Sequence, residues 1–326
     1  MPRRLVNLVL LAAVAALLAS GVIAWLLPQP DAGPLYVTHR VAGLALAAAL
    51  AWKYGIAARS IRRRGRSMSV WLGLSTALAV TVALAIGIAW TLGLASFDRP
   101  LAYSALSLHV IAGLAAAGLV VAHALVRGER RPALVTLASR RAAIRGAALF
   151  LVAMAATALV DRVGLARRAT GSRHAGSFTG NALPTTIWAF DQIPSVDVAS
   201  WRLRVGGAID RATELTYREI TAYPRTELAA VLDCTGGWWS EQRWSGVRLA
   251  DVLAAHGISP AATAVEAISV TGHRWTFDRA EAERALLATH VEGETISAAH
   301  GYPLRLVVPD RRGFTWVKWV RDIVVT

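Results

Sequence analysis

Val231-Leu232-Asp233-Cys234-Thr235-Gly236-Gly237-Trp238-Trp239 is the stretch that surrounds the single cysteine of this 326-residue chain. A lone cysteine cannot close a disulfide within its own chain. A thiolate is a soft ligand for metals, and glycine lets the backbone approach a bulky group closely. Two interpretations of Cys234 are therefore open from this stretch alone: a metal or cofactor ligand, or a small buried apolar side chain.

The first half of the chain holds most of the apolar residues, which make up 55% of the sequence. Five stretches are long enough to cross a bilayer as helices, which takes about 20 mostly apolar residues. They are Leu5–Leu27, Val37–Ala58, Val70–Leu94, Tyr103–Val126 and Ala142–Val160. The first is too long for a signal peptide and has no small-residue cleavage site, so we expect an anchor.

Basic residues gather in alternate loops between these stretches. Arginines precede the first stretch and fill the loops after the second and the fourth. The charged residues of the other two loops are Asp31, Asp98 and Arg99. The positive-inside rule then predicts a multi-pass protein of the cell (inner, cytoplasmic) membrane with a cytoplasmic N-terminus. After five crossings the C-terminal half is expected on the extracytoplasmic side.

The net charge of +14 belongs mainly to this membrane half. Residues 1–164 carry 17 Lys+Arg against 4 Asp+Glu, and residues 165–326 carry 18 against 17. The basic excess therefore sets the orientation of the helices within membrane lipid. A nearly neutral outer half argues against nucleic-acid binding, which needs a basic face.

A further basic motif directly precedes the fifth stretch. Ser139-Arg140-Arg141-Ala142-Ala143-Ile144-Arg145 resembles a twin-arginine export motif that lacks the usual phenylalanine. Such a motif would indicate export of a folded domain that already carries its cofactor. The alternative is a pair of ordinary positive-inside arginines.

Three histidines lie in the membrane half. His109 and His123 are fourteen residues apart, which places them on nearly one helix face and about 21 Å apart along the axis. With His39 as the only other histidine, two haems with two histidines each cannot be built. Our hypothesis is one haem b held by His39 and His109 near the outer surface. The alternative is an interfacial His39 and histidines satisfied inside the bundle.

The second half alternates short strands and helices after a polar linker, Arg167–Gly180. Strands are expected at Trp201–Val205, Leu228–Asp233, Val265–Val270, Leu304–Val308 and Val317–Val325, and helices at Thr216–Ala222, Val247–Ala255 and Arg279–Ala285. We therefore expect three parts. Residues 1–164 form a five-helix transmembrane bundle that is cytochrome b-like if it holds haem, residues 165–180 a linker, and residues 181–326 a mixed α+β domain.

Three motifs follow one another in that domain. Cys234 with Gly236-Gly237-Trp238 and Trp244-Ser245-Gly246-Val247 is the first; His300-Gly301-Tyr302-Pro303-Leu304-Arg305 and Gly313-Phe314-Thr315-Trp316-Val317-Lys318 follow. Together they resemble the molybdenum-ligand loop and the pterin-binding segments of the sulfite-oxidase superfamily. By loop pattern they are most similar to protein-methionine-sulfoxide reductase catalytic subunits.

The resemblance implies a molybdopterin-dependent oxidoreductase of the sulfite-oxidase type, with Cys234 as the catalytic protein ligand of molybdenum. It further implies that Arg305 and Lys318, as fixed positive donors, bind the pterin phosphate. The other implied cofactor contacts are Asn181, Pro184, Thr185, Ser269, His300, Trp316 and Val317. Arg243 and Arg248 are candidates for an oxyanion pocket, and Trp238, Trp239 and Trp244 for its wall, with at least one in the core.

The sequence departs from those reductases in two places. His300 replaces their asparagine, and their aromatic-rich asparagine–tyrosine segment is missing near Asn181. The substrate therefore stays open between a sulfoxide, small or on a protein, and a sulfite-like anion. We expect oxygen-atom transfer outside the membrane, with electrons exchanged through the haem with the quinone pool or another carrier.

Two alternatives belong to other classes of function. The outer half could be a non-catalytic binding or sensor domain with a degenerate molybdopterin fold. It could also be a thiol enzyme with Cys234 as the nucleophile and a distant base among His256, His273, His290 and His300.

Overall fold

A computed structural model of the protein describes residues 3–26, 33–64, 67–95, 104–127, 140–163, 167–186 and 192–326. The chain divides into two units, Met1–Gly171 and Ser172–Thr326. Ser139 of the twin-arginine-like motif, residues 165–166 of the predicted linker and most of the loop between the fourth and fifth stretches lie outside the described residues.

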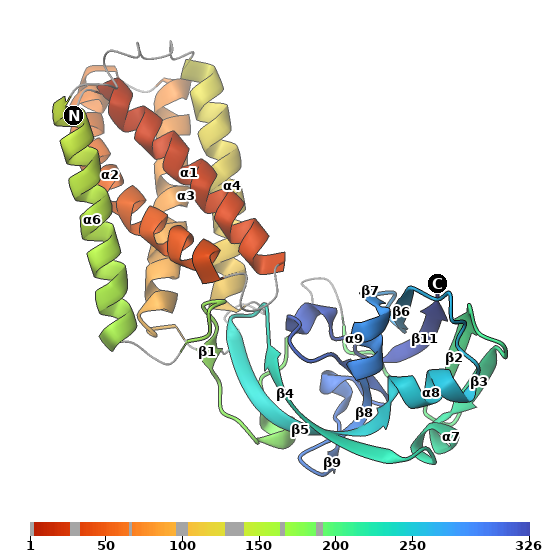
Figure 1. Cartoon of the computed structure of the whole chain (residues 1–326). Coiled ribbons are helices and arrows are strands. Elements are labelled where there is room, and N and C mark those ends of the chain that lie inside the picture. Colours follow the sequence, from red (N-terminus) through yellow and green to blue (C-terminus); the bar gives the residue numbers. More distant parts are fainter. Residues whose placement is uncertain are drawn as a thin grey trace. The chain divides into compact units, whose positions relative to one another are not determined.

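Five long helices form the first unit (Figure 1). They are α1 (Arg3–Leu26), α2 (Gly33–Arg64), α3 (Met68–Thr91), α4 (Ala105–Arg127) and α6 (Arg140–Val163). Each covers one of the five predicted stretches. Helices α2, α3, α4 and α6 are long and apolar enough to cross a membrane, while α1 contains a shorter apolar run, Val9–Ala24. Four membrane helices are therefore supported in the described part, and a fifth crossing stays a prediction.

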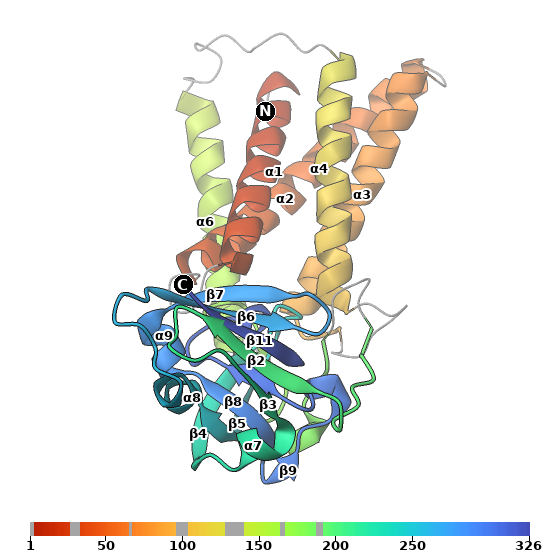
Figure 2. The ribbon, with the colours of Figure 1, turned by 90° about the vertical axis from the view of Figure 1, so that its right-hand side faces the viewer.

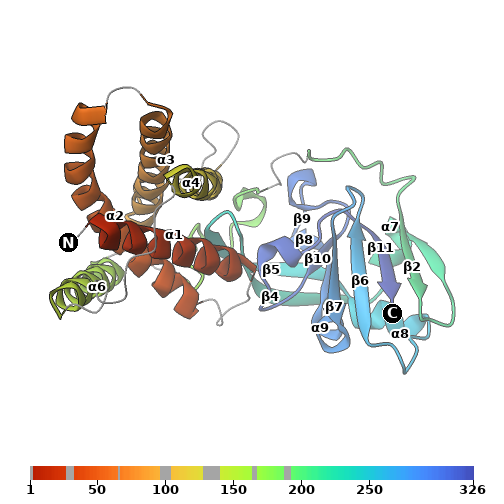
Figure 3. The ribbon, with the colours of Figure 1, turned by 90° about the horizontal axis from the view of Figure 1, so that it is seen from above.

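Helix α1 packs along α2, and α3 packs along α4 (Figure 3). Leu46 and Leu50 of α2 meet Val80 of α3 and Ala116 of α4 in a buried cluster. Arg40 of α2 also forms an ion pair with Asp161 of α6. Other large apolar side chains stay exposed, for example Leu78, Leu125 and Leu151, as is expected where a helix bundle faces lipid.

Two sheets form the second unit. A six-stranded sheet runs in the order β1 (Arg173–His174), β5 (Trp238–Arg248), β8 (Leu286–Val291) and β10 (Arg305–Val307), with β4 (Arg225–Asp233) on β5 and β9 (Glu294–Thr295) on β8. A five-stranded sheet runs in the order β3 (Thr213–Thr216), β2 (Arg202–Gly207), β11 (Val320–Val325), β6 (Ala264–Ser269) and β7 (Arg274–Asp278) (Figure 2).

Three short helices complete the unit: α7 (Tyr217–Thr221), α8 (Leu249–Ala255) and α9 (Arg279–Arg284). Thr216 begins α7 and Asp278 begins α9, each in a capping box with the glutamate three residues later. Such boxes satisfy the free backbone N–H groups of a first helical turn. All eight strands and helices expected from the sequence are present, although Val247 and Arg248 belong to β5 and not to the helix that follows.

The longest strand, β5, was not predicted, and neither were β3, β7 and β8. Strand β5 buries polar side chains that break the alternation on which strand prediction depends. Gln242 is one of them: its Nε2 donates to Thr179 Oγ1 and Ser240 Oγ at 3.1 and 2.6 Å, and its Oε1 accepts from the Gly180 N–H at 3.0 Å. A buried amide is stable here because these bonds satisfy it.

The segment expected as a linker contains β1. Arg173 and His174 pair in parallel with Trp238 and Trp239 at the start of β5. Ser172, Arg173 and Gly180 are buried. Residues 172–180 therefore pack against the strand that follows the cysteine loop.

Candidate active site

Cys234 directly follows β4 and lies in the loop that leads into β5. Its N–H donates to the Trp238 carbonyl at 2.8 Å, and the Gly237 N–H donates to the Cys234 carbonyl at 2.9 Å. The three-residue loop between these positions needs a left-handed residue at its end, and Gly237 supplies it with φ of 87°. The sulfur is buried and free, and accepts a hydrogen bond from the Gly236 N–H at 3.3 Å.

A buried ion pair lies directly before the cysteine. The Asp233 carboxylate accepts from Arg312 Nη1 at 3.0 Å and from Ser172 Oγ at 2.6 Å. The two charged side chains are only 4% and 2% exposed. Gly313 is so close that a Cβ there would lie 3.3 Å from the Cys234 Cα. Sequence reasoning missed this pair; its only local signal was a carboxylate next to a cysteine inside an apolar run.

Arg305 is a second buried cation near the cysteine. Its guanidinium lies over the rings of Trp244 and Trp316, at 5.1 and 5.7 Å from their centroids, and Nη1 donates to the His300 carbonyl at 2.9 Å. Burial lowers the pKa of Arg305 to about 10, and the nearby Cys234 thiol opposes that shift. Within the described residues Arg305 has no ion-pair partner, and its Nε has no hydrogen-bond partner.

His300 is buried in its neutral form. Its Nε2 lies 3.0 Å from the Leu183 carbonyl and 3.2 Å from Thr185 Oγ1, and its Nδ1 lies 2.8 Å from Ser297 Oγ. Burial lowers the pKa of His300 to about 4, and the charges of Arg305 and Lys318 act in the same direction. The ring therefore acts as a hydrogen-bonding group and not as a cation at neutral pH.

Lys318 connects two segments through its ammonium group. Nζ donates to the carbonyls of Thr186 and Ala299, both at 3.0 Å, and lies 4.7 Å from the ring centroid of Trp319. Trp319 Nε1 in turn donates to the Ala298 carbonyl at 2.7 Å. Lys318 is thereby held between residues 184–186 and the 3-10 turn Ala298–His300.

Thr186 joins this group to the cysteine loop. Its Oγ1 accepts from Trp238 Nε1 at 3.1 Å, and a Cβ at Gly236 would come within 2.8 Å of it. The sequence singled out Pro184 and Thr185, so it found the segment but not the residue that touches the loop. Direct contacts thus bring the loop of Cys234 together with residues 183–186, His300, Arg305 and Lys318.

The remaining predicted residues flank this cluster. Asn181 Nδ2 donates to the Thr295 carbonyl at 2.9 Å, and its Oδ1 accepts from the Ser297 N–H at 2.8 Å. Ser269 is buried and bonds to Thr271. Trp316 and Val317 are buried as well, and the Val317 carbonyl accepts from the Leu306 N–H. These contacts fix the segments around the cluster, and a cofactor role for each residue stays a prediction.

Arg243 has a different environment from the one an oxyanion pocket needs. It is exposed, forms an ion pair with Glu292 at 2.7 Å and lies over the ring of Phe178. Trp244 is fully buried with its ring edge-to-face against Trp316, and Trp238 is buried as well, so both belong to the core.

The four candidate bases have partners other than the thiol. His256 bonds to Tyr223, His273 to the Phe314 carbonyl and His290 to Thr289. With His300 bound as described above, no histidine in the described part hydrogen-bonds to Cys234. The hypothesis of a thiol nucleophile therefore gains no support from the geometry.

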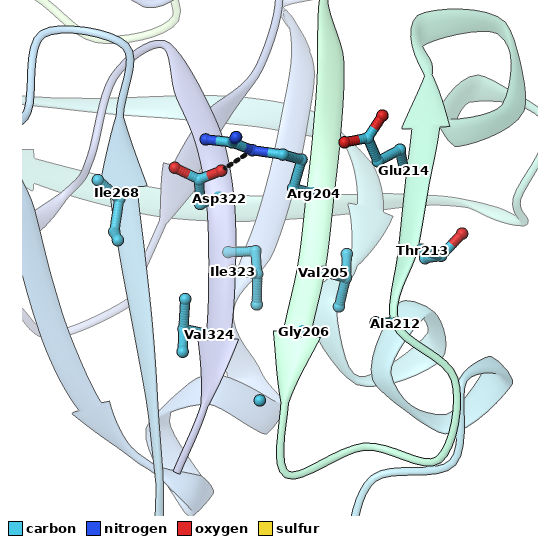
Figure 4. A pocket seen from close by; sticks show the side chains of 11 residues that line it. Arg204, Val205, Gly206, Ala212, Thr213, Glu214, Ile268, Asp322, Ile323 and Val324 are labelled. Atoms are coloured by element: carbon cyan, nitrogen blue, oxygen red, sulfur yellow. Dashed lines mark hydrogen bonds and ion pairs between the residues drawn. The ribbon is translucent and has the colours of Figure 1, made fainter.

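A groove of about 490 Å³ lies elsewhere, on the five-stranded sheet (Figure 4). Arg204 and Asp322 form an ion pair at its rim, and Ile268 and Val324 line it. None of the predicted site residues lines this groove. It is therefore separate from the cluster around Cys234.

The membrane unit contains a second cluster. The rings of His39 and His109 lie edge-to-face, with centroids 6.0 Å apart and planes at 81°. Nδ1 of His39 lies 3.1 Å from the Leu17 carbonyl, and Nδ1 of His109 lies 2.9 Å from the Ala83 carbonyl. Each ring also lies against a glycine: a Cβ at Gly21 would be 3.0 Å from His39, and one at Gly87 would be 2.8 Å from His109.

A similar level exists fourteen residues further along the helices. His123 lies against Gly73, where a Cβ would be 3.0 Å from the ring. Lys53 stands fourteen residues after His39, and its ammonium donates to the Asn7 side chain. One level therefore pairs two histidines, and the other combines a histidine with a lysine.

Comparison with known sequences identifies the second unit. Residues 190–326 match the family described as oxidoreductase molybdopterin binding domain. The oxidoreductase YuiH of Bacillus subtilis is 33% identical over 135 residues, which are 40% of this chain and 67% of YuiH. The chain belongs to this molybdopterin-binding oxidoreductase family.

Two other relatives have names that state an activity. YedZ1 of Azospira oryzae, named as a protein-methionine-sulfoxide reductase subunit, is 28% identical over 138 residues, 42% of this chain and 53% of that protein. Sulfite oxidase of Gallus gallus is 29% identical over 182 residues, 46% of this chain and 38% of that enzyme. The chain thus spans about half or less of these two proteins. The expected resemblance to the sulfite-oxidase superfamily is confirmed.

The site fits the cofactor of this oxidoreductase family. A molybdopterin is an anionic group with sulfur ligands, and the cluster offers a thiol, two buried guanidinium groups and an ammonium. The Nε of Arg305 and two N–H positions of Arg312, Nε and Nη2, have no hydrogen-bond partner in the described part. Buried charges need counter-charges, and an anionic cofactor would supply them.

Proposed function

We propose that this molybdopterin oxidoreductase is anchored in the cell membrane and transfers oxygen atoms on the extracytoplasmic side. The observation that carries the proposal is the convergence of the Cys234 loop with Arg305, His300 and Lys318. Cys234 would be the metal ligand. The bound cofactor supplies the two-electron chemistry, while the protein holds and orients it.

The residues of the cluster divide into charge carriers and neutral donors. Arg305 and Lys318 would bind the phosphate of the pterin, because cationic donors make the strongest bonds to phosphate oxygens. Neutral His300 would bind a pterin edge. Asn181, Pro184, Thr185, Ser269, Trp316 and Val317 would shape the rest of the cofactor site. The edge-to-face rings of Trp244 and Trp316 keep water away from the Arg305 guanidinium.

A sulfoxide, on a small molecule or a protein, is the substrate class that we favour. The name of YedZ1 supports it, and the ion pair of Arg243 with Glu292 leaves that arginine no free charge for a sulfite-like anion. The alternative reaction at the same cofactor is the oxidation of a sulfite-like anion.

The membrane part is proposed to comprise residues 1–164 with five crossings, and the catalytic domain residues 181–326. Of the expected linker, residues 165–180, the part from Ser172 onward packs with the catalytic domain through β1. The alternating basic loops support a cytoplasmic N-terminus and an outer catalytic domain. The apolar length of α2, α3, α4 and α6 supports integration into membrane lipid.

We further propose that His39 and His109 hold one haem b. Histidine nitrogens bind metals at about 2.0–2.1 Å. The ring centroids of His39 and His109 are 6.0 Å apart, so both imidazoles would be within reach of one metal ion. The carbonyl contacts of both Nδ1 atoms leave Nε2 for the metal, the usual arrangement of a ligand histidine. Such a haem would exchange electrons with the quinone pool or another carrier.

Elemental analysis and optical spectroscopy of the detergent-purified full chain test both proposals together. We expect stoichiometric molybdenum that is lost in Cys234→Ser, and a dithionite-responsive haem spectrum that is lost in His39→Ala. Absence of molybdenum from protein made in cells that synthesise the cofactor would favour the non-catalytic binding domain. A colourless protein with full activity would exclude the haem alone.

A further inference from the structure

The Asp233–Arg312 ion pair is almost fully buried. Its side chains are 4% and 2% exposed, and the N···O distance is 3.0 Å. A buried ion pair costs desolvation energy, and apolar residues of similar size often stabilise a fold equally well or better. The neighbouring Arg311 pairs with Glu281 of α9 in a partly exposed position. Of the two consecutive arginines, Arg312 therefore pairs inside the protein beside the cysteine loop, and Arg311 pairs near the surface.

The pair is joined rigidly to the cysteine. Asp233 precedes Cys234 in the chain, and Gly313, which follows Arg312, contacts the backbone of Cys234. An isolated parallel bridge also links the backbones of Asp233 and Arg312. A change in charge at either residue would therefore act on the sulfur from a fixed distance.

Buried cations outnumber the buried carboxylate around the cysteine loop. Arg305, Arg312 and Arg173 are buried guanidinium groups, and Asp233 is the buried carboxylate that pairs with Arg312. Buried charges interact more strongly than exposed ones, because little water screens them. Two N–H positions of Arg312 lack a hydrogen-bond partner in the described part, so its charge is only partly compensated by Asp233.

We propose that Asp233 and Arg312 are positioning residues that set the redox potential of the metal bound to Cys234. The carboxylate stabilises the more oxidised, more positive metal, and the guanidinium stabilises the reduced metal. This inference rests on the proposed role of Cys234 as metal ligand. The two residues would change the redox potential of the metal and not the binding of substrate.

A redox titration of the molybdenum signal in the full-length holoenzyme tests the proposal. Asp233→Asn removes the negative charge and should favour the reduced metal about tenfold, a rise of ~59 mV for one electron. Arg312→Met should shift the potential by a similar amount in the opposite direction. Arg312→Lys, and the double variant Asp233→Asn/Arg312→Met, should stay near the wild-type potential.

Arg311→Met is the matched control, since it removes an adjacent arginine whose partner is Glu281. It should leave the potential unchanged. Loosening of the fold cannot produce opposite shifts in the two single variants and their cancellation in the double variant. If Arg312→Met does not fold, Asp233→Asn and the double variant still decide the sign and the cancellation.

Two outcomes distinguish the metal-ligand role of Cys234 from the tuning role of Asp233 and Arg312. Wild-type protein without molybdenum would contradict the metal-ligand role of Cys234 itself. Wild-type protein with molybdenum, but with equal potentials in Asp233→Asn and the parent, would overturn the tuning role and leave the metal site intact.

Discussion

The His109 ring lies so close to Gly87 that a methyl group at residue 87 would come within 2.8 Å of the ring carbon Cε1. His39 has a similar relationship to Gly21 on α1. Glycine is normally a poor residue for a helix interior. Its presence at both contacts therefore indicates that room beside the imidazoles matters more than the intrinsic stability of the helix.

Gly87→Ala should displace the His109 ring and lower haem occupancy at least severalfold. The added methyl group would clash with the ring, and the rigid helix backbone at residue 87 cannot move aside. Gly113→Ala is the matched control, because a Cβ at residue 113 meets nothing within 4 Å. Alanine there should be neutral or stabilise α4 by up to about 1 kcal/mol. The haem absorbance per protein after purification measures both. Equal absorbance in the two variants would contradict the assignment.

Arg305→Met should abolish retention of the molybdenum cofactor. The substitution keeps the apolar contacts with Trp244 and Trp316 but removes the buried charge that would hold an anion. Arg243→Met is the surface control: an exposed pair contributes about 0–1 kcal/mol to stability, so its metal content should match the wild type. Molybdenum and pterin assays on both variants provide the measurement, and full metal content in Arg305→Met would refute this role.

His300 should make the catalytic domain less stable in mild acid. Burial lowers its pKa in the folded protein to about 4, from the usual 6.5 of a histidine. The unfolded chain therefore takes up a proton first, so stability is full above about pH 6.5 and falls as the pH drops towards 4. The loss amounts to about 3 kcal/mol at most. Thermal unfolding of the full chain at pH 7 and pH 5 should show a smaller pH dependence in His300→Gln.

Thr186→Val should loosen the cysteine loop. It removes the acceptor of the Trp238 indole N–H, and an unsatisfied buried donor costs about 1–3 kcal/mol. We expect a lower unfolding temperature and partial loss of molybdenum, while Thr186→Ser should keep both near the wild-type values. A valine variant that retains full metal content and stability would show that Trp238 does not need this bond.

The sequence predicted those parts of the fold whose signal is local. Apolar runs marked all five long helices, and alternation marked strands such as β6. Strand β5 escaped because its buried Gln242 and Ser240 look like surface residues until the partners from residues 179–180 are known. Those partners are about sixty residues away in the chain, so no local pattern could indicate them.

The site was predicted where a motif existed. Cys234, His300, Arg305 and Lys318 belong to recognisable segments, and the structure brings those segments together. Arg312 and Thr186 were missed because their significance comes from contacts across the fold. Arg312 meets a carboxylate 79 positions earlier in the chain, and Thr186 meets a lysine 132 positions later.

The helix bundle repeats part of the His39–His109 arrangement fourteen residues along its helices. His123 lies against Gly73, as His109 lies against Gly87, whereas Lys53 and Asn7 occupy the positions that correspond to His39 and Gly21. The Lys53 ammonium donates to the Asn7 side chain there. Within the described residues the bundle therefore brings two imidazoles together at one of these levels and a lysine and an amide at the other.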